Sequence, residues 1–537
     1  MMHKITKKIA EELRIPKINI IYFIIILNPL IAISQPQNII IDNNQNNNPN
    51  EPSIIISRKN TNNILAGSNI DNYYTSTDGG YTWNKAYITS NYGVWGDPSL
   101  NVDTNGNFYF FHLSNPQTGN WIDRIVCQKI ENWNFTTDSY AGLNGTKMQD
   151  KPWSVVNYNT NEIYLTWTQF DDYGTNNPND SSVILFSKST DGGTTWSQPK
   201  KISKFAGNCM DSDSTTEGAV PAIGQNGEIY VAWAYANKIY FNKSLDDGTT
   251  WLNQETFVCN QIGGWDYTIP GINRCNGLPV TVTDLSNSPY RGTIYINFTD
   301  QRNGTNNTDV WLVKSTDGGA TWSQPQKVNN DTSQTHQFLS WITIDQITGY
   351  IYIIFYDRRN YTDNNTDVYL AMSKDGGNSF ENIKINETSF NPNASVFFGD
   401  YINISAYNNV IRPIWTQLNN DQLSILTAIV DTSDFIVGIN QPKKQKNIID
   451  NKISINPNPF KDRTFISYKI HKKSNVKIIL NNIYGTKIKT LKNTSQKAGK
   501  YIQEISKTAN NLKNGIYFVQ IIINNNTIIT KKIILNN

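Results

Sequence analysis

Carboxylate, arginine and aromatic side chains occur together in the predicted loops of this chain. Four residues could act as acid, base or nucleophile, namely Glu217, Asp266, Asp400 and Tyr401. Others could hold a bound molecule, namely Arg274, Arg302, Arg358, Arg359, Trp153 and Trp265. Aromatic rings stack on sugar faces, guanidinium groups hold anions, and paired carboxyl groups serve as acid and base in glycoside cleavage. These residue types therefore indicate chemistry on glycans.

The same residues also have structural interpretations. Asp300-Gln301-Arg302 and Asp357-Arg358-Arg359 follow equivalent strands of neighbouring repeats, so they fit Arg–Asp braces as well as ligand binding. Carboxylates that precede the innermost strands can cap loops, and these are Asp97, Asp150 and Asp400. Glu217 lies directly before an inner strand, which makes it the best single candidate for an acid or base.

A metal site is a weaker hypothesis. Asp211 and Asp213 place carboxylates at alternate positions, a spacing that Ca²⁺ sites use. The other ligands of a calcium-binding loop are missing, so we expect neither a metal nor another cofactor. His336 stands alone and fits a structural role better than that of a ligand.

An eight-residue pattern, Ser-x-Asp-x-Gly-x-Thr-Trp, occurs five times, the last time in a weaker form. The copies are Ser76–Trp83, Ser189–Trp196, Ser244–Trp251, Ser315–Trp322 and Ser373–Phe380. In each copy we expect the aspartate to accept backbone N–H bonds in a tight turn and the glycines to adopt positive φ. The aromatic ring is expected to plug the space between neighbouring sheets. The pattern therefore predicts a hairpin repeated along the chain.

Each copy falls inside a larger unit of four predicted antiparallel strands. The second strand is the easiest to recognise and lies at 64–66, 108–111, 163–167, 229–233, 294–298, 351–355 and 411–415. The first two copies begin 113 residues apart, against 55, 71 and 58 for the later ones, so one unit there has lost the pattern. These units predict an all-β fold with a seven-bladed β-propeller.

The seventh unit, from Gly399 to about Val430, shows only three strands and no copy of the pattern. Residues 36–43 resemble the fourth-strand segment 325–330. We therefore expect residues 36–43 to supply the missing strand of the seventh unit. This pairing would close the ring and remove both sheet edges.

The order of strands also predicts where a site lies. In a four-stranded meander the repeated pattern, which joins strands three and four, shares one rim with the turns between strands one and two. The loops between strands two and three, and between successive units, lie at the opposite rim. These loops are long and polar and contain the candidate residues, and loops on a rigid scaffold often carry function. We therefore expect the site at that opposite rim.

The repeated pattern resembles the Asp box of the sialidase-like β-propellers. The resemblance implies a propeller with a glycoside hydrolase-like activity. Sialidases have six blades, whereas the strands of this chain count to seven. The alternative is a non-catalytic carbohydrate-binding or adhesion propeller. Sialidases hold the substrate carboxylate with three arginines, one in an Arg-Ile-Pro motif. The chain has this motif only at Arg14-Ile15-Pro16, and the matching place before the first inner strand reads Asn50-Glu51-Pro52. An anion clamp would then fall to Arg302, Arg358 and Arg359.

The chain divides into four predicted segments. Residues 1–34 run from a basic start into an apolar stretch and are typical of a cleaved export signal. Residues 35–435 form the propeller, 436–452 a polar linker, and 453–537 a small β-sandwich. The last segment resembles the C-terminal sorting domain of type IX secretion substrates, for example at Asn456-Pro457-Asn458-Pro459-Phe460. This implies passage across the outer membrane, with the secretion machinery as a partner.

Charge and cysteine content limit the remaining functions. Residues 441–537 contain 19 Lys and Arg against 3 Asp and Glu, whereas residues 35–440 contain 23 against 39. An acidic main body repels phosphate backbones, so we expect no nucleic-acid partner. We expect no transmembrane segment in the mature chain, and a secreted or cell-surface monomer that binds a glycan or glycoprotein. Four cysteines cannot form a disulfide scaffold, although Cys259 and Cys275 could pair.

Overall fold

The structure is a computed structural model that describes residues 35–43, 48–419, 421–435, 454–470, 473–482, 487–523 and 527–536. The chain divides into two compact units, one of which is Gln35–Ile436, while the other contains the C-terminal residues. The predicted export signal and the predicted linker lie outside the described residues.

The described part of the first unit contains seven four-stranded antiparallel sheets. The first sheet consists of β2 (Ser53–Ile56), β3 (Ile64–Ser68), β4 (Asn72–Ser76) and β5 (Asn84–Tyr87). The second consists of β6 (Ser99–Val102), β7 (Phe108–Leu113), β8 (Ile125–Glu131) and β9 (Asn134–Ala141). The third consists of β10 (Met148–Val156), β11 (Ile163–Phe170), β12 (Ser182–Ser189) and β13 (Lys200–Lys201).

The remaining sheets repeat this order. The fourth consists of β14 (Glu217–Ile223), β15 (Ile229–Tyr235), β16 (Lys238–Ser244) and β17 (Thr256–Asn260). The fifth consists of β18 (Val280–Thr283), β19 (Ile294–Asp300), β20 (Asp309–Ser315) and β21 (Gln326–Lys327). The sixth consists of β22 (Gln337–Ile344), β23 (Ile351–Asp357), β24 (Asp367–Ser373) and β25 (Glu381–Lys384). The seventh consists of β26 (Asn403–Tyr407), β27 (Val410–Asn419), β28 (Gln422–Asp431) and β1 (Gln37–Asp42).

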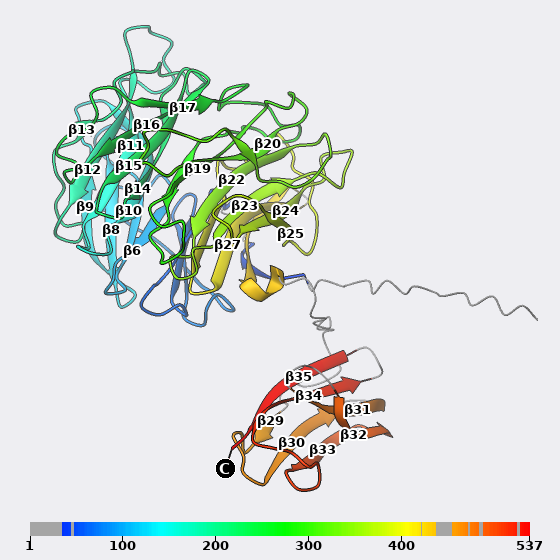
Figure 1. The fold of residues 1–537 in the computed structure, drawn as a ribbon. Helices are drawn as coiled ribbons and strands as arrows, with labels where there is room; N and C mark the ends of the chain where they lie inside the picture. The colour runs from blue at the N-terminus through cyan, green and yellow to red at the C-terminus, as the bar shows by residue number, and fades with distance from the viewer. Residues whose placement is uncertain are drawn as a thin grey trace, which may run out of the picture. The chain divides into compact units, whose positions relative to one another are not determined.

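The sheets stand side by side in a closed ring (Figure 1). Their first strands contact one another in the order β2, β6, β10, β14, β18, β22, β26 and back to β2. The second strands are buried on both faces because each sheet is covered by its two neighbours, which explains their nearly continuous apolar sequences. Trp167, Trp233 and Trp415 are fully buried at equivalent places in these strands. The predicted all-β propeller fold is confirmed.

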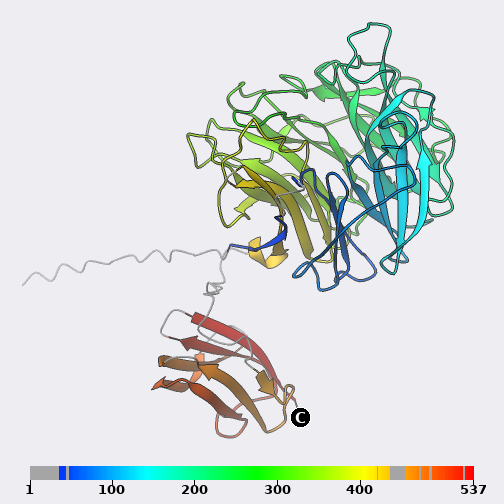
Figure 2. The ribbon, with the colours of Figure 1, turned by 180° about the vertical axis from the view of Figure 1, so that it is seen from behind.

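The N-terminal strand β1 completes the seventh sheet by pairing with β28, for example Ile39 opposite Thr427. Figure 2 shows β1, in dark blue, beside the yellow strands of that sheet. Asp42, at the end of β1, accepts a hydrogen bond of 2.8 Å from the Tyr74 hydroxyl of β4, which joins the last sheet to the first. The predicted closure of the ring by this segment is confirmed.

The repeated Ser-x-Asp pattern forms the predicted turn between the third and fourth strands. In the first copy, the Asp78 carboxylate accepts bonds from the backbone N–H groups of Tyr81 (3.1 Å) and Thr82 (3.0 Å) and from the Ser76 hydroxyl (2.9 Å). Gly79 and Gly80 have φ of 79° and 92°, which glycine adopts without steric cost. The same bonds recur around Asp191, Asp246, Asp317 and Asp375.

The aromatic ring of each Asp box is only half-buried, which differs from the plug predicted from sequence. Trp322, for example, meets Phe241 of the preceding sheet edge to face at 5.1 Å. A second inter-sheet contact comes from cations: Lys243 donates to the Gly318 carbonyl (2.7 Å) and Arg412 to the Gly79 carbonyl (2.7 Å). Where the next sheet contains an Asp box, hydrogen bonds of this kind thus add to the packing between neighbouring sheets.

The four cysteines are buried free thiols. The pairing of Cys259 with Cys275, which the sequence left open, does not form: Cys259 packs with Phe241 and Phe298, and Cys275 with Tyr267 and Phe338. Among the described residues the one helical segment is the 3-10 turn η1 (Thr432–Phe435), and no helix there is suited to crossing a membrane.

The second unit is a two-sheet β-sandwich. One sheet contains β29 (Ser454–Asn456), β30 (Arg463–Ile470) and β33 (Gly499–Ser506). The other contains β32 (Lys487–Gln496), β31 (Ser474–Asn481), β34 (Gly515–Ile523) and β35 (Thr527–Leu535). Ile466, Val476 and Val519 from the two sheets share one core and are fully buried.

Ring closure can be tested by truncation. A chain that begins at residue 44 lacks β1, leaves β28 as an exposed edge and loses the Asp42–Tyr74 bond, so its melting temperature should fall by at least about 5 °C. The matched control begins at residue 35 and keeps β1. Differential scanning calorimetry of the two chains measures the effect, and equal melting temperatures would contradict closure by β1.

Candidate functional site

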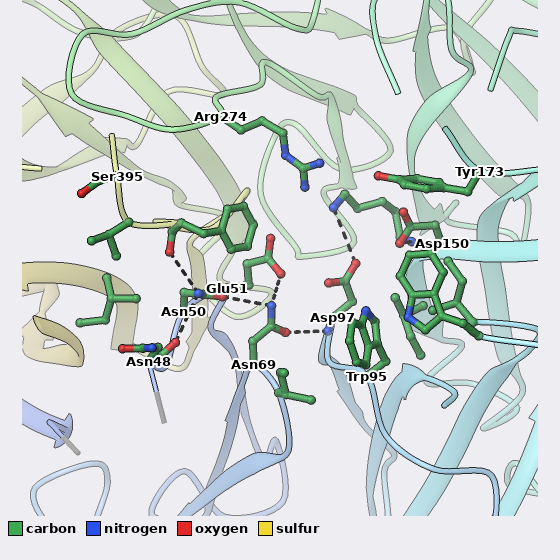
Figure 3. Close-up of a pocket in the computed structure, with 18 of the residues that line it drawn as sticks. Asn48, Asn50, Glu51, Asn69, Trp95, Asp97, Asp150, Tyr173, Arg274 and Ser395 are labelled. Carbon is green, nitrogen blue, oxygen red and sulfur yellow. Dashed lines mark hydrogen bonds and ion pairs between the residues drawn. The ribbon is translucent and has the colours of Figure 1, made fainter. Parts of the chain in front are cut away.

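A pocket of about 690 Å³ opens at the rim that the strand order predicted. Its lining comes from loops that join successive sheets and from loops between second and third strands (Figure 3). Asp97 and Arg274 represent the first kind, and Asn69 and Tyr173 the second. The Asp boxes follow the third strands and therefore lie at the other rim, so the turns and this pocket are at opposite rims.

Three charged residues enter the pocket from the starts of neighbouring inner strands. Glu51, Asp97 and Lys151 have φ of 51°, 53° and 50°, and each precedes a proline. Positive φ is uncommon for side chains of this size and is often found at functional sites. At the equivalent places in two other sheets, Gly218 and Leu339 also have positive φ, of 77° and 47°. The strained entry to the strand thus positions all three charged side chains on the pocket wall.

A buried ion network centres on Asp400. The Lys151 ammonium lies 2.7 Å from Asp400 Oδ2 and 3.7 Å from Asp97 Oδ2. The Arg274 guanidinium forms a forked pair with Asp400, with Nε 2.8 Å from Oδ1, and its Nη1 lies 2.8 Å from Asp211 Oδ2. The Tyr173 hydroxyl donates to the same Asp211 oxygen at 2.7 Å. Residues from several separate sheets are therefore tied together across the ring axis.

A second set of hydrogen bonds joins Glu51 to Asp97 through Asn69. The Asn69 amide donates to Glu51, and its carbonyl oxygen accepts the Asp97 backbone N–H at 2.7 Å. Glu51 Oε1 also accepts the backbone N–H of Asp400 at 2.9 Å. Figure 3 shows Glu51, Asn69 and Asp97 side by side on one wall.

The carboxyl groups of the site differ in protonation. Burial raises the pKa of Asp400, but Lys151 and Arg274 more than offset this and lower it to about 2. Burial raises the pKa of Asp97 to about 7 against the opposing effect of Lys151. Burial, with repulsion from Asp97 and Asp211, raises the pKa of Asp150 to about 7. The ionised Asp400, which is buried behind the pocket lining, therefore lies near two pocket carboxyls that titrate near neutral pH.

Glu217 lies close to this network but not on the pocket wall. It is fully buried, and neither of its carboxylate oxygens has a partner in hydrogen-bonding geometry. Burial, together with the charges of Asp211 and Asp150, raises the pKa of Glu217 well above its usual value. Glu217 is therefore a neutral carboxylic acid at the start of β14, behind the wall that Asp150 and Lys151 form.

Tyr401 and Trp153 lie beneath the ion network and close the centre of the ring. Trp153 contacts Trp341 with ring centres 4.4 Å apart and Tyr401 with ring centres 5.1 Å apart. The Tyr401 hydroxyl is buried without a hydrogen-bond partner, and burial raises its pKa well above the usual value. Tyr401 is therefore a neutral phenol that does not line the large pocket.

The remaining sequence candidates lie outside the pocket lining. Asp266 is exposed, and its backbone N–H donates to Asp213 at 2.8 Å. Trp265 is buried, and its indole N–H points to the Thr215 carbonyl at 3.4 Å. Of the sequence candidates, Asp400 and Arg274 are thus in direct contact, whereas Asp266 and Trp265 bond to other residues.

The two Asp-x-Arg turns form braces. Arg302 pairs with Asp300, with Nη2 2.6 Å from Oδ2, and stacks over Trp311. Arg359 pairs with Asp357 in the same way and stacks over Tyr369.

Arg358 is buried over the Phe338 ring, where burial lowers its pKa to about 10. It bonds to Thr366 and Asn364. His336, whose pKa is lowered to about 4 by burial and by Arg358, bonds to the Thr308 hydroxyl. Neither residue lines the pocket.

Several pocket residues were missed by sequence reasoning. Trp95, Trp121 and Tyr173 form a continuous aromatic wall, with neighbouring ring centres 5.6 Å and 5.8 Å apart. Glu51 and Lys151 were also missed as site residues. A signal existed for these two, because Glu51-Pro52, Asp97-Pro98 and Lys151-Pro152 each place a charged residue before a proline at the start of an inner strand.

The carboxylates considered for Ca²⁺ have protein partners. Asp211 accepts bonds from Arg274 and Tyr173, and Asp213 accepts the backbone N–H of Asp266. Within the described ranges, no three His, Cys, Asp or Glu side chains gather as metal ligands.

Comparison with known families identifies the second unit. Residues 454–536 match the secretion system C-terminal sorting domain. The sorting domain indicates export by type IX secretion to the cell surface or the medium, and it makes the secretion machinery a partner of this chain. A search of curated proteins gave no match to the chain.

Solved structures similar to part of the chain include the Hadza microbial sialidase Hz136, at 12% identity over 70% of this chain and 74% of that one, with a TM-score of 0.40. A PL25 ulvan lyase bound to a GlcA–Rha3S saccharide is 14% identical over 75% and 95%, with a TM-score of 0.42. The α-L-arabinofuranosidase Arb93A from Fusarium graminearum is 12% identical over 75% and 99%, with a TM-score of 0.41. These similarities carry no argument about the activity of this chain.

The protonation of Glu217 can be tested through stability. Because its folded-state pKa is raised, its contribution to stability is full below its unfolded pKa and is lost as pH rises through the folded value. The melting temperature of the native protein should therefore fall as pH rises above the usual pKa of glutamate, and more steeply than that of Glu217→Gln. Glu381→Gln, at an exposed position on β25, is the control. Equal destabilisation of Glu217→Gln at every pH would instead indicate an ionised, paired Glu217.

Proposed function

We propose that the propeller binds a glycan in the pocket of about 690 Å³ and cleaves it as a glycoside hydrolase-like enzyme. The observation that carries this proposal is the pair of pocket carboxyls, Asp97 and Asp150, whose pKa values are raised to about 7 on either side of Lys151. Carboxyl groups poised near the working pH are suited to give and take protons.

The two carboxyls have different roles in this proposal. Asp97 faces the Lys151 ammonium at 3.7 Å, which favours its ionised form, so Asp97 is the base or nucleophile. Burial raises the pKa of Asp150 most, Lys151 lowers it, and the negative charges of Asp97 and Asp211 raise it again. Asp150 therefore keeps its proton and is the general acid that protonates the leaving oxygen.

Other pocket residues position this pair. Lys151 is held by Asp400, and Asn69 fixes the backbone of Asp97. Asp400 itself, with both oxygens engaged by cations, serves as the anchor of Lys151 and Arg274. Trp95, Trp121 and Tyr173 pack edge to face in the aromatic wall, and Trp95, which is 40% exposed, offers apolar ring surface to a sugar.

A non-catalytic glycan-binding or adhesion propeller is the second candidate. The observation that favours it is that the permanently ionised carboxylate of the site, Asp400, is buried and fully ion-paired, so it has no free oxygen for chemistry. Both candidates suit an exported protein, since glycans are abundant outside the cell. Glycan binding without any cleaved product would favour this second candidate.

The acid–base assignment predicts a pH profile. Cleavage requires ionised Asp97 and protonated Asp150, so kcat/KM should follow a bell with its maximum at about pH 7, falling on the alkaline side as Asp150 loses its proton. Asp150→Asn should lower kcat at least about 100-fold and remove the alkaline limb. Asp363→Asn, an exposed carboxylate on the same rim, is the control. An unchanged profile in Asp150→Asn would exclude Asp150 as the acid.

The aromatic wall predicts a binding defect. Trp95→Ala removes a half-exposed stacking surface, so glycan affinity should fall about tenfold, or ~1.4 kcal/mol, with little loss of thermal stability. Tyr81→Ala, which removes an exposed ring at the Asp-box rim, should leave affinity unchanged. Isothermal titration calorimetry with the bound glycan compares the two variants. The reverse pattern would place the binding face at the Asp-box rim.

A further inference from the structure

The cations that line the pocket are already neutralised by the protein. Arg274 uses all three of its guanidinium nitrogens: Nε and Nη2 donate to Asp400, and Nη1 donates to Asp211. Lys151 contacts Asp400 at 2.7 Å, and its side chain is only 9% exposed. The two positive charges of the pocket are therefore matched by two carboxylates in direct contact, before any ligand binds.

The pocket lining contains further carboxyl groups. Glu51, Asp97, Asp150 and Asp421 all line it, and none of them has an arginine partner. Asp97 has Lys151 at 3.7 Å as its nearest cation, and that lysine is shared with Asp400. A carboxylate, sulfate or phosphate group on a sugar would therefore find no unpaired cation on the pocket wall, and it would lie close to the ionised Asp400 that holds Lys151 and Arg274, which is unfavourable in a partly desolvated site.

The three arginines that the sequence suggested for anion binding cannot compensate. Arg302 and Arg359 are held by Asp300 and Asp357 in their braces, and Arg358 is buried against Phe338. None of the three lines the pocket. An anion would have to bind Arg274 through the two of its five N–H groups that do not donate to Asp400 or Asp211, against the negative charges of those two carboxylates. In the described part of the pocket wall, Arg274 is the only arginine, and its charge is shared between two carboxylates.

We infer that the pocket selects glycans whose sugars carry no carboxylate, sulfate or phosphate group. This inference rests on the proposed glycan-binding function and narrows its ligand class. The anion clamp that the sequence resemblance implied for Arg302, Arg358 and Arg359 is replaced by internal ion pairs. An acidic sugar would need a free cation, and both cations of the pocket, Lys151 and Arg274, are already paired with Asp400. Neutral sugars need no such cation.

The test compares ligands that differ only in charge. Oligogalacturonate and its methyl ester, sialyllactose and lactose, and sulfated and unsulfated chito-oligosaccharides form three such pairs, beside a panel of neutral hexasaccharides. With the full chain at low ionic strength, where charge effects are greatest, each acidic member should bind at least about tenfold more weakly than its neutral partner. An acidic member that binds more tightly than its partner overturns the inference but leaves glycan binding intact. No binding to any saccharide overturns the proposed function as well.

A variant of the protein tests the same inference in a way that does not depend on the choice of saccharides. Asp211→Asn removes one of the two carboxylates that hold Arg274 while the amide oxygen can still accept from Tyr173, so the fold should persist. The ratio of acidic to neutral dissociation constants should then fall at least about threefold. Asp213→Asn, two residues away and without a bond to Arg274, is the matched control. An unchanged ratio in Asp211→Asn would show that Arg274 pairing does not exclude anions.

Discussion

The pocket depends on the buried pairing of Asp400 with Lys151 and Arg274. Taking three charges out of water is unfavourable unless each is matched and hydrogen-bonded, and removing one member leaves an uncompensated charge. Here Lys151 starts an inner strand of the third sheet, Arg274 precedes the fifth, and Asp400 precedes the seventh. The network therefore fixes the distance between sheets that are remote along the chain, and it sets the protonation of the neighbouring carboxyls.

The ring around this network gives it a rigid frame. Each sheet is covered on both faces, and the Asp boxes with their lysine and arginine hydrogen bonds hold neighbouring sheets together at the opposite rim. Beneath the ions, Trp153, Trp341 and Tyr401 fill the centre of the ring. These three aromatic rings therefore pack at the centre of the ring of sheets. The loops that line the pocket can differ in sequence while the sheets keep their arrangement.

Local features could be predicted from sequence, and features that depend on backbone direction could not. The Asp boxes are local, because each aspartate bonds within five residues, and the closing strand β1 carries the pattern of a fourth strand. The Asp300–Arg302 brace was one of two interpretations that sequence left open, since the residues are only two apart. Glu51 and Lys151 could not be placed, because whether a side chain before a proline faces the axis depends on a positive φ that the sequence does not reveal. Glu217 was predicted as an acid or base directly before an inner strand, but its separation from the pocket depends on tertiary packing.

The pairing of β1 with β28 also has a consequence for biosynthesis. The ribosome makes the first strand of the propeller almost four hundred residues before the strand that it must join. Until β28 has been translated, β1 has no partner and the first and last sheets cannot be sealed, which is a long-range step of the kind that slows folding. The sorting domain, which directs secretion, is translated after the propeller. It therefore becomes available only when the chain already contains every strand of the ring.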